Sequence, residues 1–211
     1  MGSTEVFLTT DRLVLRPFAP GEEGLLVALD GDPEVMRYLS GGRPTPLEVA
    51  RDEHLPGMLR RYPCTGTRGY WAVEEAATGE WLGWFEFRPL KEDSAAEVEL
   101  GYRLRRVAWG RGLATEGARA LVDKGFAELG VERVVAYTMA VNSGSRRVME
   151  KAGLTYVTTH FEKWPDPIEG AEEGEVEYAL TRAQWLSRRS APETAPGSPA
   201  DASAWAPIGS P

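Results

Sequence analysis

The chain has 211 residues, of which 42% are hydrophobic and 27% charged, and this length and composition suit one domain with a sizeable core. Its formal net charge of −8 at pH 7 argues against nucleic acid as a partner, because proteins that bind a phosphate backbone usually carry a strongly basic face. The one cysteine, Cys64, excludes an internal disulfide, and since no apolar stretch approaches the roughly 20 residues that span a bilayer, we expect a soluble cytoplasmic protein.

The N-terminal part of the chain alternates strand-like and helix-like patterns. Pro56 interrupts the second helical pattern, so we expect that helix to kink or split before it. The segment "AATGE" between two strand patterns predicts a hairpin turn. The predicted elements of this part are a strand at 12–18, helical regions at 22–39 and 45–62, and strands at 70–75 and 81–87.

The segment "AEVELGYRL" at 96–104 alternates apolar and polar residues, which predicts a strand with one buried face. Glu97, Glu99 and Arg103 share its polar face. Gly101 interrupts that face, and a glycine within a strand often marks a bulge or a close approach of another group to the backbone.

From Leu113 onward, apolar residues recur at steps of three and four, which predicts a helix that Gly130 caps. The segment from Ser187 to Pro211 is mostly Pro, Ala, Ser and Gly and predicts a disordered tail. We therefore expect a single mixed α/β domain over 1–186 and a tail over 187–211. The other predicted elements are a strand at 133–141, a short helix at about 143–152, strands near 154–161 and 175–181, and a capping box of Thr181 and Gln184.

The stretch "WGRGLATEG", Trp109 to Gly117, joins the predicted strand to the predicted helix. The first N–H groups of a helix lack partners and favour an anion, and glycines let a phosphate approach the backbone closely. The stretch therefore predicts a site for a phosphate-bearing ligand, unless Gly110 and Gly112 only ease a turn and Gly117 only allows close packing. The neighbouring arginines that favour a polyanion are Arg105, Arg106 and Arg111.

Two common nucleotide loops do not fit this stretch. A P-loop requires Gly-Lys followed by Ser or Thr, and no such tripeptide occurs in the chain. A dinucleotide-binding loop requires a third glycine where Thr115 stands, and its strand opens a series of βαβ units, whereas this strand is the fourth one predicted.

The residues "WGRGLATE" resemble the acetyl-CoA pyrophosphate loop of the GNAT N-acetyltransferases. Gly112 and Ala114 fill the last two fixed places of that loop, and Trp109 stands where Gln or Arg is expected, as is usual in the RimJ/RimL-like branch, which resembles the ribosomal-protein N-terminal acetyltransferases. The segments "TDRLVLRPF", "DPEVMRYL", "EVELGYRL", "NSGSRRVMEKAGL" and "VEYALT" resemble that branch in the same order, over about residues 10–186. The resemblance implies the GNAT fold, a mixed and mostly antiparallel sheet of about seven strands, flanked by helices, in which strands four and five splay apart.

The resemblance also implies acetyl-CoA as co-substrate, without a metal. The backbone of Tyr102, Arg103 and Leu104 would pair with the pantetheine arm. Asn142 and Ser145 match the family's "N-x-x-S" and would bond to the pantetheine or to neighbouring backbone. The residues assigned to the pyrophosphate loop are Trp109, Gly110, Arg111, Gly112, Leu113, Ala114 and Thr115.

The implied reaction transfers an acetyl group from the thioester to a primary amine by direct attack in a ternary complex. A lysine-type amine with a pKa of about 10.4 costs roughly 4.6 kcal/mol to deprotonate at neutral pH, an α-amine near 7.7 costs only about 1, and the thiol leaves readily because its pKa is about 8.5. A base therefore matters more than an acid. Glu97 and Glu99 are the candidate bases, with Glu99 favoured because it lies closer to the presumed bulge, and Glu86 is a weaker rival.

The position of the family's acid tyrosine falls on Met149, so Ser145 or solvent would protonate the leaving thiolate. This departure leaves an alternative function open, a catalytically inactive acyl-CoA-binding regulatory module. A nucleotide-dependent enzyme is a third interpretation, which the failed nucleotide loops disfavour.

The expected partners are acetyl-CoA and an amine acceptor, either a protein N-terminal α-amine or a small-molecule amine, and the expected assembly is a monomer or a homodimer. An acidic stretch between Glu162 and Glu177 would attract a cationic amine, or is simply solvated. Aromatic residues on adjacent strands would line an acceptor pocket or belong to the core. They are Trp71, Trp81, Trp84 and Phe85.

Overall fold

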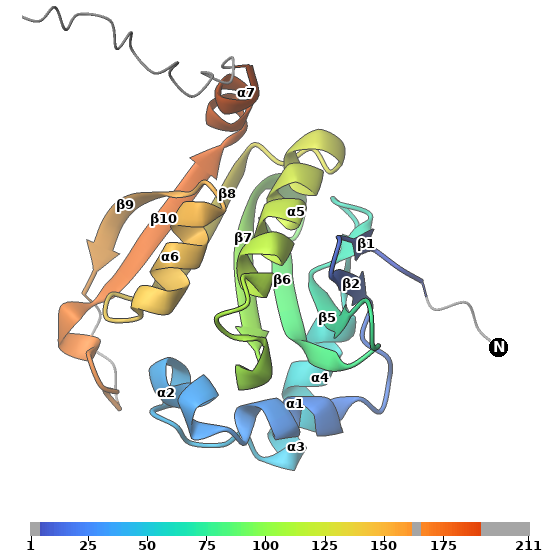
Figure 1. Cartoon of the computed structure of the whole chain (residues 1–211), viewed down its shortest axis with the longest axis vertical. Coiled ribbons are helices and arrows are strands. Elements are labelled where there is room, and N and C mark those ends of the chain that lie inside the picture. The colour runs from blue at the N-terminus through green and yellow to red at the C-terminus, as the bar shows by residue number, and fades with distance from the viewer. Residues whose placement is uncertain (1–4, 162–165, 191–211) are drawn as a thin grey trace, which may run out of the picture.

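The alternating segments build one eight-stranded sheet, which Figure 1 shows with helices on both sides. The structure is a computed structural model that describes residues 5–161 and 166–190. The strands lie in the order β1-β2-β5-β6-β7-β8-β10-β9, and β3 (Arg61–Tyr62) and β4 (Thr67–Arg68) form a separate hairpin. The strands of the sheet are β1 (Leu8–Thr9), β2 (Leu13–Arg16), β5 (Tyr70–Glu75), β6 (Trp81–Lys91), β7 (Ser94–Leu104), β8 (Arg133–Met139), β9 (Thr155–His160) and β10 (Glu175–Thr181).

The seven predicted strands are all present in the sheet, to which the short β1 adds an eighth. The strands β3 and β4 were not predicted, and β3 shows that the helical prediction at 45–62 extends too far, since α4 ends at Leu59. Every pair of neighbours in the sheet is antiparallel except β7 and β8, which helix α5 (Leu113–Glu128) connects as a crossover. β7 and β8 pair only from Glu97–Arg133 to Glu99–Val135, although both strands continue further. The predicted splay of strands four and five is therefore confirmed, and it leaves an open edge along the end of β7.

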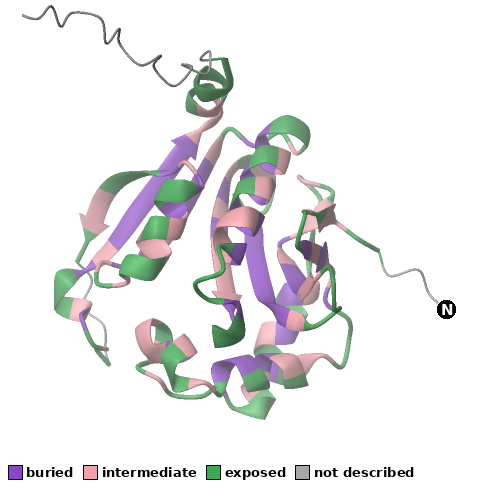
Figure 2. Ribbon diagram, viewed as in Figure 1, coloured by how far each residue is buried: buried purple, intermediate pink, exposed green. Residues whose placement is uncertain are grey.

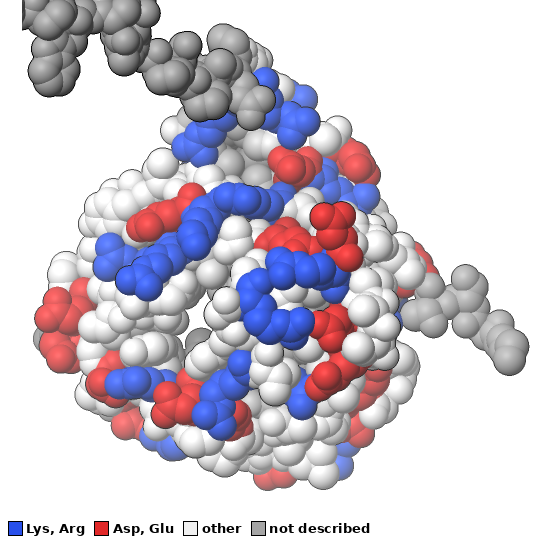
Figure 3. All heavy atoms as spheres, viewed as in Figure 1, with Lys and Arg blue, Asp and Glu red and all other residues white. Residues whose placement is uncertain are grey.

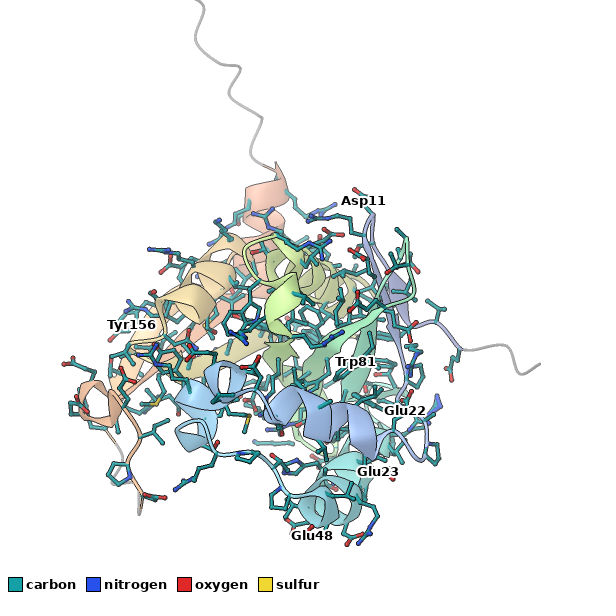
Figure 4. The ribbon with its side chains drawn as sticks, turned by 60° about the horizontal axis from the view of Figure 1, so that its bottom comes forward. Asp11, Glu22, Glu23, Glu48, Trp81 and Tyr156 are labelled. Atoms are coloured by element: carbon teal, nitrogen blue, oxygen red, sulfur yellow. The ribbon has the colours of Figure 1, made fainter. Side chains whose placement is uncertain are left out.

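The sheet has two faces with separate cores. On the α5 face, α5 and α6 (Ser143–Lys151) cover a main core of apolar side chains from most of the strands. On the α1 face, α1 (Glu23–Asp30) and the helix that ends in α4 (Leu55–Leu59) enclose a smaller core around Trp84. Figure 2 shows the central strands as the most buried part of the chain, and Figure 4 looks onto the α1 side, where Glu22, Glu23 and Glu48 mark the helices and Trp81 marks the start of β6.

The helical prediction at 22–39 is wrong in one respect, because the structure divides it into α1 and α2 (Pro33–Ser40). Asp32 caps the second helix, its Oδ1 accepting the N–H of Glu34 at 3.1 Å, and Pro33 occupies the first turn. The segment "DGDP" contained both signals for a new helix start.

The expected split before Pro56 is absent, because the helix runs on from Leu47 to Leu59, but its hydrogen-bonding pattern changes before the proline. α3 (Leu47–Val49) passes into a π-helical segment at Ala50–His54, and α4 begins at Leu55. Proline has no N–H to donate, so the regular hydrogen-bonding pattern changes in the turn before it.

The C-terminal capping box is confirmed, since Gln184 Oε1 accepts the N–H of Thr181 at 2.9 Å and Thr181 Oγ1 accepts the N–H of Gln184 at 3.3 Å. Helix α7 (Arg182–Ser190) extends past the predicted domain boundary, so residues 187–190 of the predicted tail are helical. The rest of that predicted tail lies outside the described residues. Among residues 5–161 and 166–190, the structure has no helix long and apolar enough to cross a membrane.

Gly117 lies where α5 packs closely on the sheet, so a substitution there tests this packing. A Cβ atom at this position would come within 2.3 Å of Phe85 Cζ, in the main core. We expect Gly117→Ala to destabilise the protein by about 1–3 kcal/mol in urea unfolding, because the ring cannot move without disturbing its neighbours. The control is Gly24→Ala in α1, where nothing lies within 4 Å of the added atom and a gain of up to about 1 kcal/mol is expected. Equal effects at the two sites would contradict the packing role of Gly117.

Candidate active site

The loop before α5 is a backbone cradle at a helix N-terminus. Gly110 and Gly112 have φ angles of +70° and +78°, a left-handed conformation that other residues rarely adopt, and a Cβ atom on Gly110 would have nothing within 4 Å. Gly112 is the N-cap of α5, and no side chain in the described part of the chain caps this helix. The first intrahelical bond joins Glu116 N to Gly112 O at 3.0 Å, so the N–H groups before it remain available to a ligand. The cradle fits a phosphate group.

The three arginines near this loop are engaged in ion pairs. Figure 3 shows one face of the molecule hollowed between α2, α6 and the loop before α5, with Lys and Arg side chains beside the hollow. Because acidic partners already neutralise these arginines, the sequence-based expectation that they add strongly to polyanion binding is weakened. The pairs are Arg105 with Glu80, Arg106 with Asp32, and Arg111 with Glu75.

The open edge of β7 runs through Tyr102, Arg103 and Leu104, which are the residues expected to hold the pantetheine arm. Trp109 occupies part of this edge, because its indole Nε1 donates to Leu104 O at 2.8 Å. The Arg103 side chain points to the α1 face, where Nη1 contacts Asp30 Oδ1 at 2.6 Å. The edge is therefore fixed at one end by side chains, while its backbone remains free of β8.

On the α5 face of β7, two hydroxyl groups meet across the opening. The Tyr102 hydroxyl lies 3.0 Å from Ser145 Oγ and also donates to Ser145 O at 3.0 Å. Asn142 caps α6, with its Oδ1 accepting the N–H of Ser145 at 3.1 Å and its Nδ2 donating to Thr138 Oγ1. Met149 is buried in the main core. The structure thus brings Tyr102, Asn142 and Ser145 together, and Ser145 lies in the first turn of α6.

On the α1 face of β7, two carboxylates share one guanidinium. Arg88 Nη2 donates to Glu99 Oε2 at 2.6 Å, and Arg88 Nε donates to Glu86 Oε1, which also accepts the Tyr70 hydroxyl at 3.0 Å. Burial, and then the charge of Glu99, raise the pKa of Glu86 to about 7. The same environment, burial first and then Glu86, raises the pKa of Tyr70.

The expected bulge at Gly101 is absent, because Glu86 and Gly101 are regular partners of β6 and β7. The irregularity in this pair of strands lies between Pro89 and Lys91. Gly101 instead allows a close approach, since a Cβ atom there would lie 2.8 Å from Glu86 Oε2. The sequence could not reveal this neighbour, because it belongs to another strand and depends on the register.

Glu97 lies apart from this pair. It sits opposite Arg133, within the part of β7 that pairs with β8, and forms an ion pair with that residue. Arg133 also binds Glu177 at 2.7 Å. Glu97 is therefore held in a separate network, farther from the open edge than Glu99.

The aromatic residues divide between the two cores. Trp71 and Phe85 belong to the main core, and Trp84 belongs to the smaller core on the α1 face. Arg103 stacks over Trp84 at 5.0 Å from the ring centroid. Phe85 lies against Tyr102, with 6.0 Å between the ring centroids, and Trp81 packs, partly buried, against the smaller core. The aromatic side chains therefore mostly build the two cores, and Trp84 and Phe85 each adjoin a side chain of the open edge.

Residues 12–155 match the family model described as the acetyltransferase (GNAT) domain. The FsC-acetyl coenzyme A-N(2)-transacetylase of Aspergillus fumigatus is 38% identical over 186 residues, which cover 85% of this chain and 77% of that protein. The chain belongs to the GNAT family of acetyl-CoA-dependent N-acetyltransferases.

Solved structures of the family share the architecture of this acetyltransferase. A GNAT acetyltransferase from Bacillus anthracis, 24% identical, aligns with a TM-score of 0.70 over 84% of this chain and 99% of its own. RimL, a ribosomal L7/L12 α-N-protein acetyltransferase in complex with coenzyme A, is 17% identical and aligns with a TM-score of 0.69 over 84% of this chain and 98% of its own. At these identities the likeness concerns the fold, which confirms the predicted GNAT fold.

The candidate site of this acetyltransferase has two chemical environments, one on each face of β7. The loop before α5 and the hydroxyls of Tyr102 and Ser145 lie with the helices of the α5 face, and the pair Glu86–Glu99 lies on the α1 face. Between them is the edge of β7 that β8 leaves free. A proton acceptor and a proton donor can therefore act from opposite faces of one strand.

Glu86 makes the stability of the fold depend on pH. Since its pKa rises from 4.5 to about 7 on folding, the neutral acid is favoured in the folded state. Its contribution to stability is full below about pH 4.5 and is lost as the pH rises through about 7, by on the order of 3 kcal/mol. We expect Glu86→Gln to remove this loss. Between pH 5 and 8, the free energy of unfolding in urea should therefore decrease less for the variant than for the wild type.

The control for this measurement is Glu74→Gln on the neighbouring strand, where Glu74 forms an ion pair with Arg16 at 2.7 Å. Comparing each protein with itself at two pH values cancels any loss of packing that the substitution causes. The same fall in stability in Glu86→Gln as in the wild type would show that Glu86 does not titrate in this range.

Proposed function

We propose that this enzyme transfers the acetyl group of acetyl-CoA to a primary amine by direct attack within a ternary complex. The observation that carries the proposal is the opening between β7 and β8, with hydroxyl groups on one face of β7 and carboxylates on the other. Direct attack requires both substrates at one point, and the free edge of β7 is reachable from both faces. An inactive acyl-CoA-binding module would not need a buried carboxylate beside that edge.

The cofactor half of the proposal uses backbone groups. The N–H groups from Gly110 to Thr115 would hold the pyrophosphate at the uncapped N-terminus of α5. The backbone of residues 102–104 would pair with the pantetheine amides as a neighbouring strand does. Acetyl-CoA bound in this way supplies the thioester carbonyl and the leaving thiolate.

The leaving thiolate would take its proton from Ser145 or from solvent. Ser145 Oγ lies 3.0 Å from the Tyr102 hydroxyl, which donates its own proton to Ser145 O, so a proton that Ser145 gives up would be replaced from solvent. Burial raises the pKa of Tyr102, which keeps its hydroxyl protonated. The thiol has a pKa of about 8.5, so it leaves without strong acid assistance and Ser145 has a modest role.

The acceptor is a primary amine, and we propose a protein N-terminal α-amine, in line with the RimJ/RimL-like branch, or a small-molecule amine. Support for the first comes from the RimL neighbour, and for the second from the relative named as an N(2)-transacetylase. The acidic stretch supports a cationic acceptor less than the sequence suggested, because two of its residues are engaged in ion pairs. Glu162 lies outside the described residues. Asp166 is paired with Arg43 and Glu169 with Arg37, across a pocket of about 630 Å³ beside α2.

The pyrophosphate assignment is tested by Gly112→Glu. A carboxylate at the N-cap of α5 would occupy the space of the phosphate and repel it, and a left-handed residue other than glycine adds strain of roughly 1–2 kcal/mol. We expect binding of acetyl-CoA, measured by calorimetry, to weaken at least about 100-fold, equivalent to about 2.7 kcal/mol. Gly130→Glu is the control, because Gly130 has a φ of +72° and open space around it at the other end of the same helix. Unchanged affinity in Gly112→Glu would remove the loop from the site.

The acceptor is tested by release of free thiol from acetyl-CoA with a panel of amines. The panel contains a peptide with a free N-terminus, its Nα-blocked lysine counterpart, spermidine and an aminoglycoside. We expect at least one amine to stimulate thiol release and to gain an acetyl group by mass spectrometry. Binding of acetyl-CoA without thiol release for any amine would favour the inactive acyl-CoA-binding module instead.

A further inference from the structure

Two donors hold one carboxylate oxygen of Glu86, and the other oxygen lies over Gly101 of β7. The residue is 8% exposed, and burial of a charge in such a place is costly unless it is compensated. Oε1 receives both contacts, from the Tyr70 hydroxyl and from Arg88 Nε. Oε2 has no hydrogen-bond partner in the described part of the chain. The carboxylate is thus fixed in orientation and retains a free acceptor atom.

Gly101 provides the space in front of that free oxygen. It is the partner of Glu86 on β7, and it comes two residues after Glu99, the last residue of β7 that pairs with β8. A Cβ atom on Gly101 would lie 2.8 Å from Glu86 Oε2, and its backbone does not have the positive φ that would otherwise explain a glycine. The absence of a side chain therefore leaves Oε2 directly beside the open edge, where residue 101 is itself partly exposed.

Glu99 is placed differently although it lies on the same face. Its Oε2 is bound by Arg88 Nη2 at 2.6 Å, and its side chain is 22% exposed. The Arg88 guanidinium thus forms ion pairs with both Glu86 and Glu99. When both carboxylates are ionised, these three side chains together carry one net negative charge. In such a pair the more buried member takes up a proton more readily, because its charged form is less well solvated.

We propose that Glu86, through Oε2, accepts the proton of the attacking amine, and that Arg88 and Glu99 are positioning residues that orient it and tune its proton affinity. This inference rests on the proposed transfer to an amine. The amine enters as an ammonium ion and gives one proton to Glu86, and its nitrogen lone pair then forms the C–N bond as the C–S bond of the thioester breaks. The amide nitrogen loses a second proton, the thiolate gains one, and the net products are the amide, free CoA thiol and one proton released to solvent.

The groups that face Glu86 set the pH dependence. They are Tyr70 from β5, Arg88 from β6 and Glu99 from β7. Arg88 stays charged over the working range, and Tyr70 stays protonated because its pKa is raised. Glu99 is therefore the charge whose removal changes Glu86 most simply. Without it, Glu86 would ionise at lower pH, and the acidic limb of the rate profile would move to lower pH.

The experiment measures kcat and kcat/KM for thiol release between pH 6 and 10, with the fastest acceptor of the amine panel. The full-length wild type is compared with Glu86→Gln, Glu86→Asp, Glu99→Gln and the control Glu74→Gln. We expect Glu86→Gln to lose about 100-fold or more in kcat at pH 7 and Glu86→Asp to lose less. We expect Glu99→Gln to retain turnover above pH 8 with its acidic limb shifted to lower pH, and Glu74→Gln to follow the wild type.

The two substitutions of Glu86 separate a chemical role from a structural one. Glutamine keeps an acceptor for Tyr70 and Arg88 but no base, and aspartate keeps a base but retracts it from both. A structural role would therefore make Glu86→Asp the worse variant, and that order would overturn the proposal. A greater loss in Glu99→Gln than in Glu86→Gln would do the same and would assign the base to Glu99.

Acetyl-CoA binding by each variant, measured by thermal shift, shows that the fold is retained. If Glu86→Gln does not fold, the direction of the pH shift in Glu99→Gln decides, and an unmoved limb contradicts the proposal. Failure of the wild type to release thiol with any amine would contradict the proposed function itself. Turnover by the wild type with an unchanged profile in Glu86→Gln would contradict only the assignment of Glu86.

Discussion

The parting of β7 and β8 after Glu99 and Val135 is the constraint on which the rest of the structure depends. Backbone groups in the middle of a sheet normally pair with the next strand, and unpaired groups are costly where water is excluded. At this opening, side chains make some of the contacts that a neighbouring strand would otherwise provide. Trp109 donates to the carbonyl of Leu104, and the Tyr102 hydroxyl reaches across to α6. These contacts hold the opening without closing it, so that a ligand with its own amide groups can pair with the free edge.

A buried ion pair fixes the other side of the same strand. Asp30 is 2% exposed and accepts both Arg103 Nη1 and Thr45 Oγ1 at 2.6 Å. Removing either partner would leave a buried charge unpaired, which is far more costly than losing a surface ion pair. Helix α1 and the segment after α2 are therefore tied to the end of β7. The wall on the acceptor side and the strand proposed to bind the cofactor keep a fixed relation to each other.

The fold was largely predictable because its signals are local. The alternation in 96–104 and the three- and four-residue steps after Leu113 mark a strand and a helix regardless of what surrounds them. The positive φ angles of Gly110 and Gly112 fit their reading as parts of a backbone cradle. The break at Asp32 was also readable, since Asp-Pro is a helix start, and overlooking it merged two helices.

The chemistry of the α1 face was not predictable in the same way. Glu86 stands in "WFEFRP" as one acid among apolar neighbours, and nothing in that segment shows what faces it. Its environment arises from Gly101 on β7, from Tyr70 on β5 and from the charge of Glu99, each placed by strand register. A register shift of one residue would turn all of these side chains to the opposite face. The sequence identified the candidate carboxylates. Which of them is the best candidate base depends on the pairing of β5, β6 and β7, and these pairings cannot be read from any one segment of the sequence.

The proposed reaction needs one proton removed from the amine and one added to the thiolate, and the first transfer needs more help than the second. The groups on the two faces of β7 differ accordingly. Deprotonating a lysine-type ammonium near pH 7 costs roughly 4.6 kcal/mol, whereas protonating a thiolate whose thiol has a pKa of about 8.5 is favourable at that pH. On the acceptor side, a carboxylate is buried, oriented by two donors and placed beside a second negative charge. On the cofactor side, two hydroxyls share a 3.0 Å contact, and Met149 packs in the core where the family's acid tyrosine is expected. Under the proposed function, a strongly basic acceptor would place the more demanding proton transfer on the α1 face of β7, and a dedicated acid on the α5 face would be needed less.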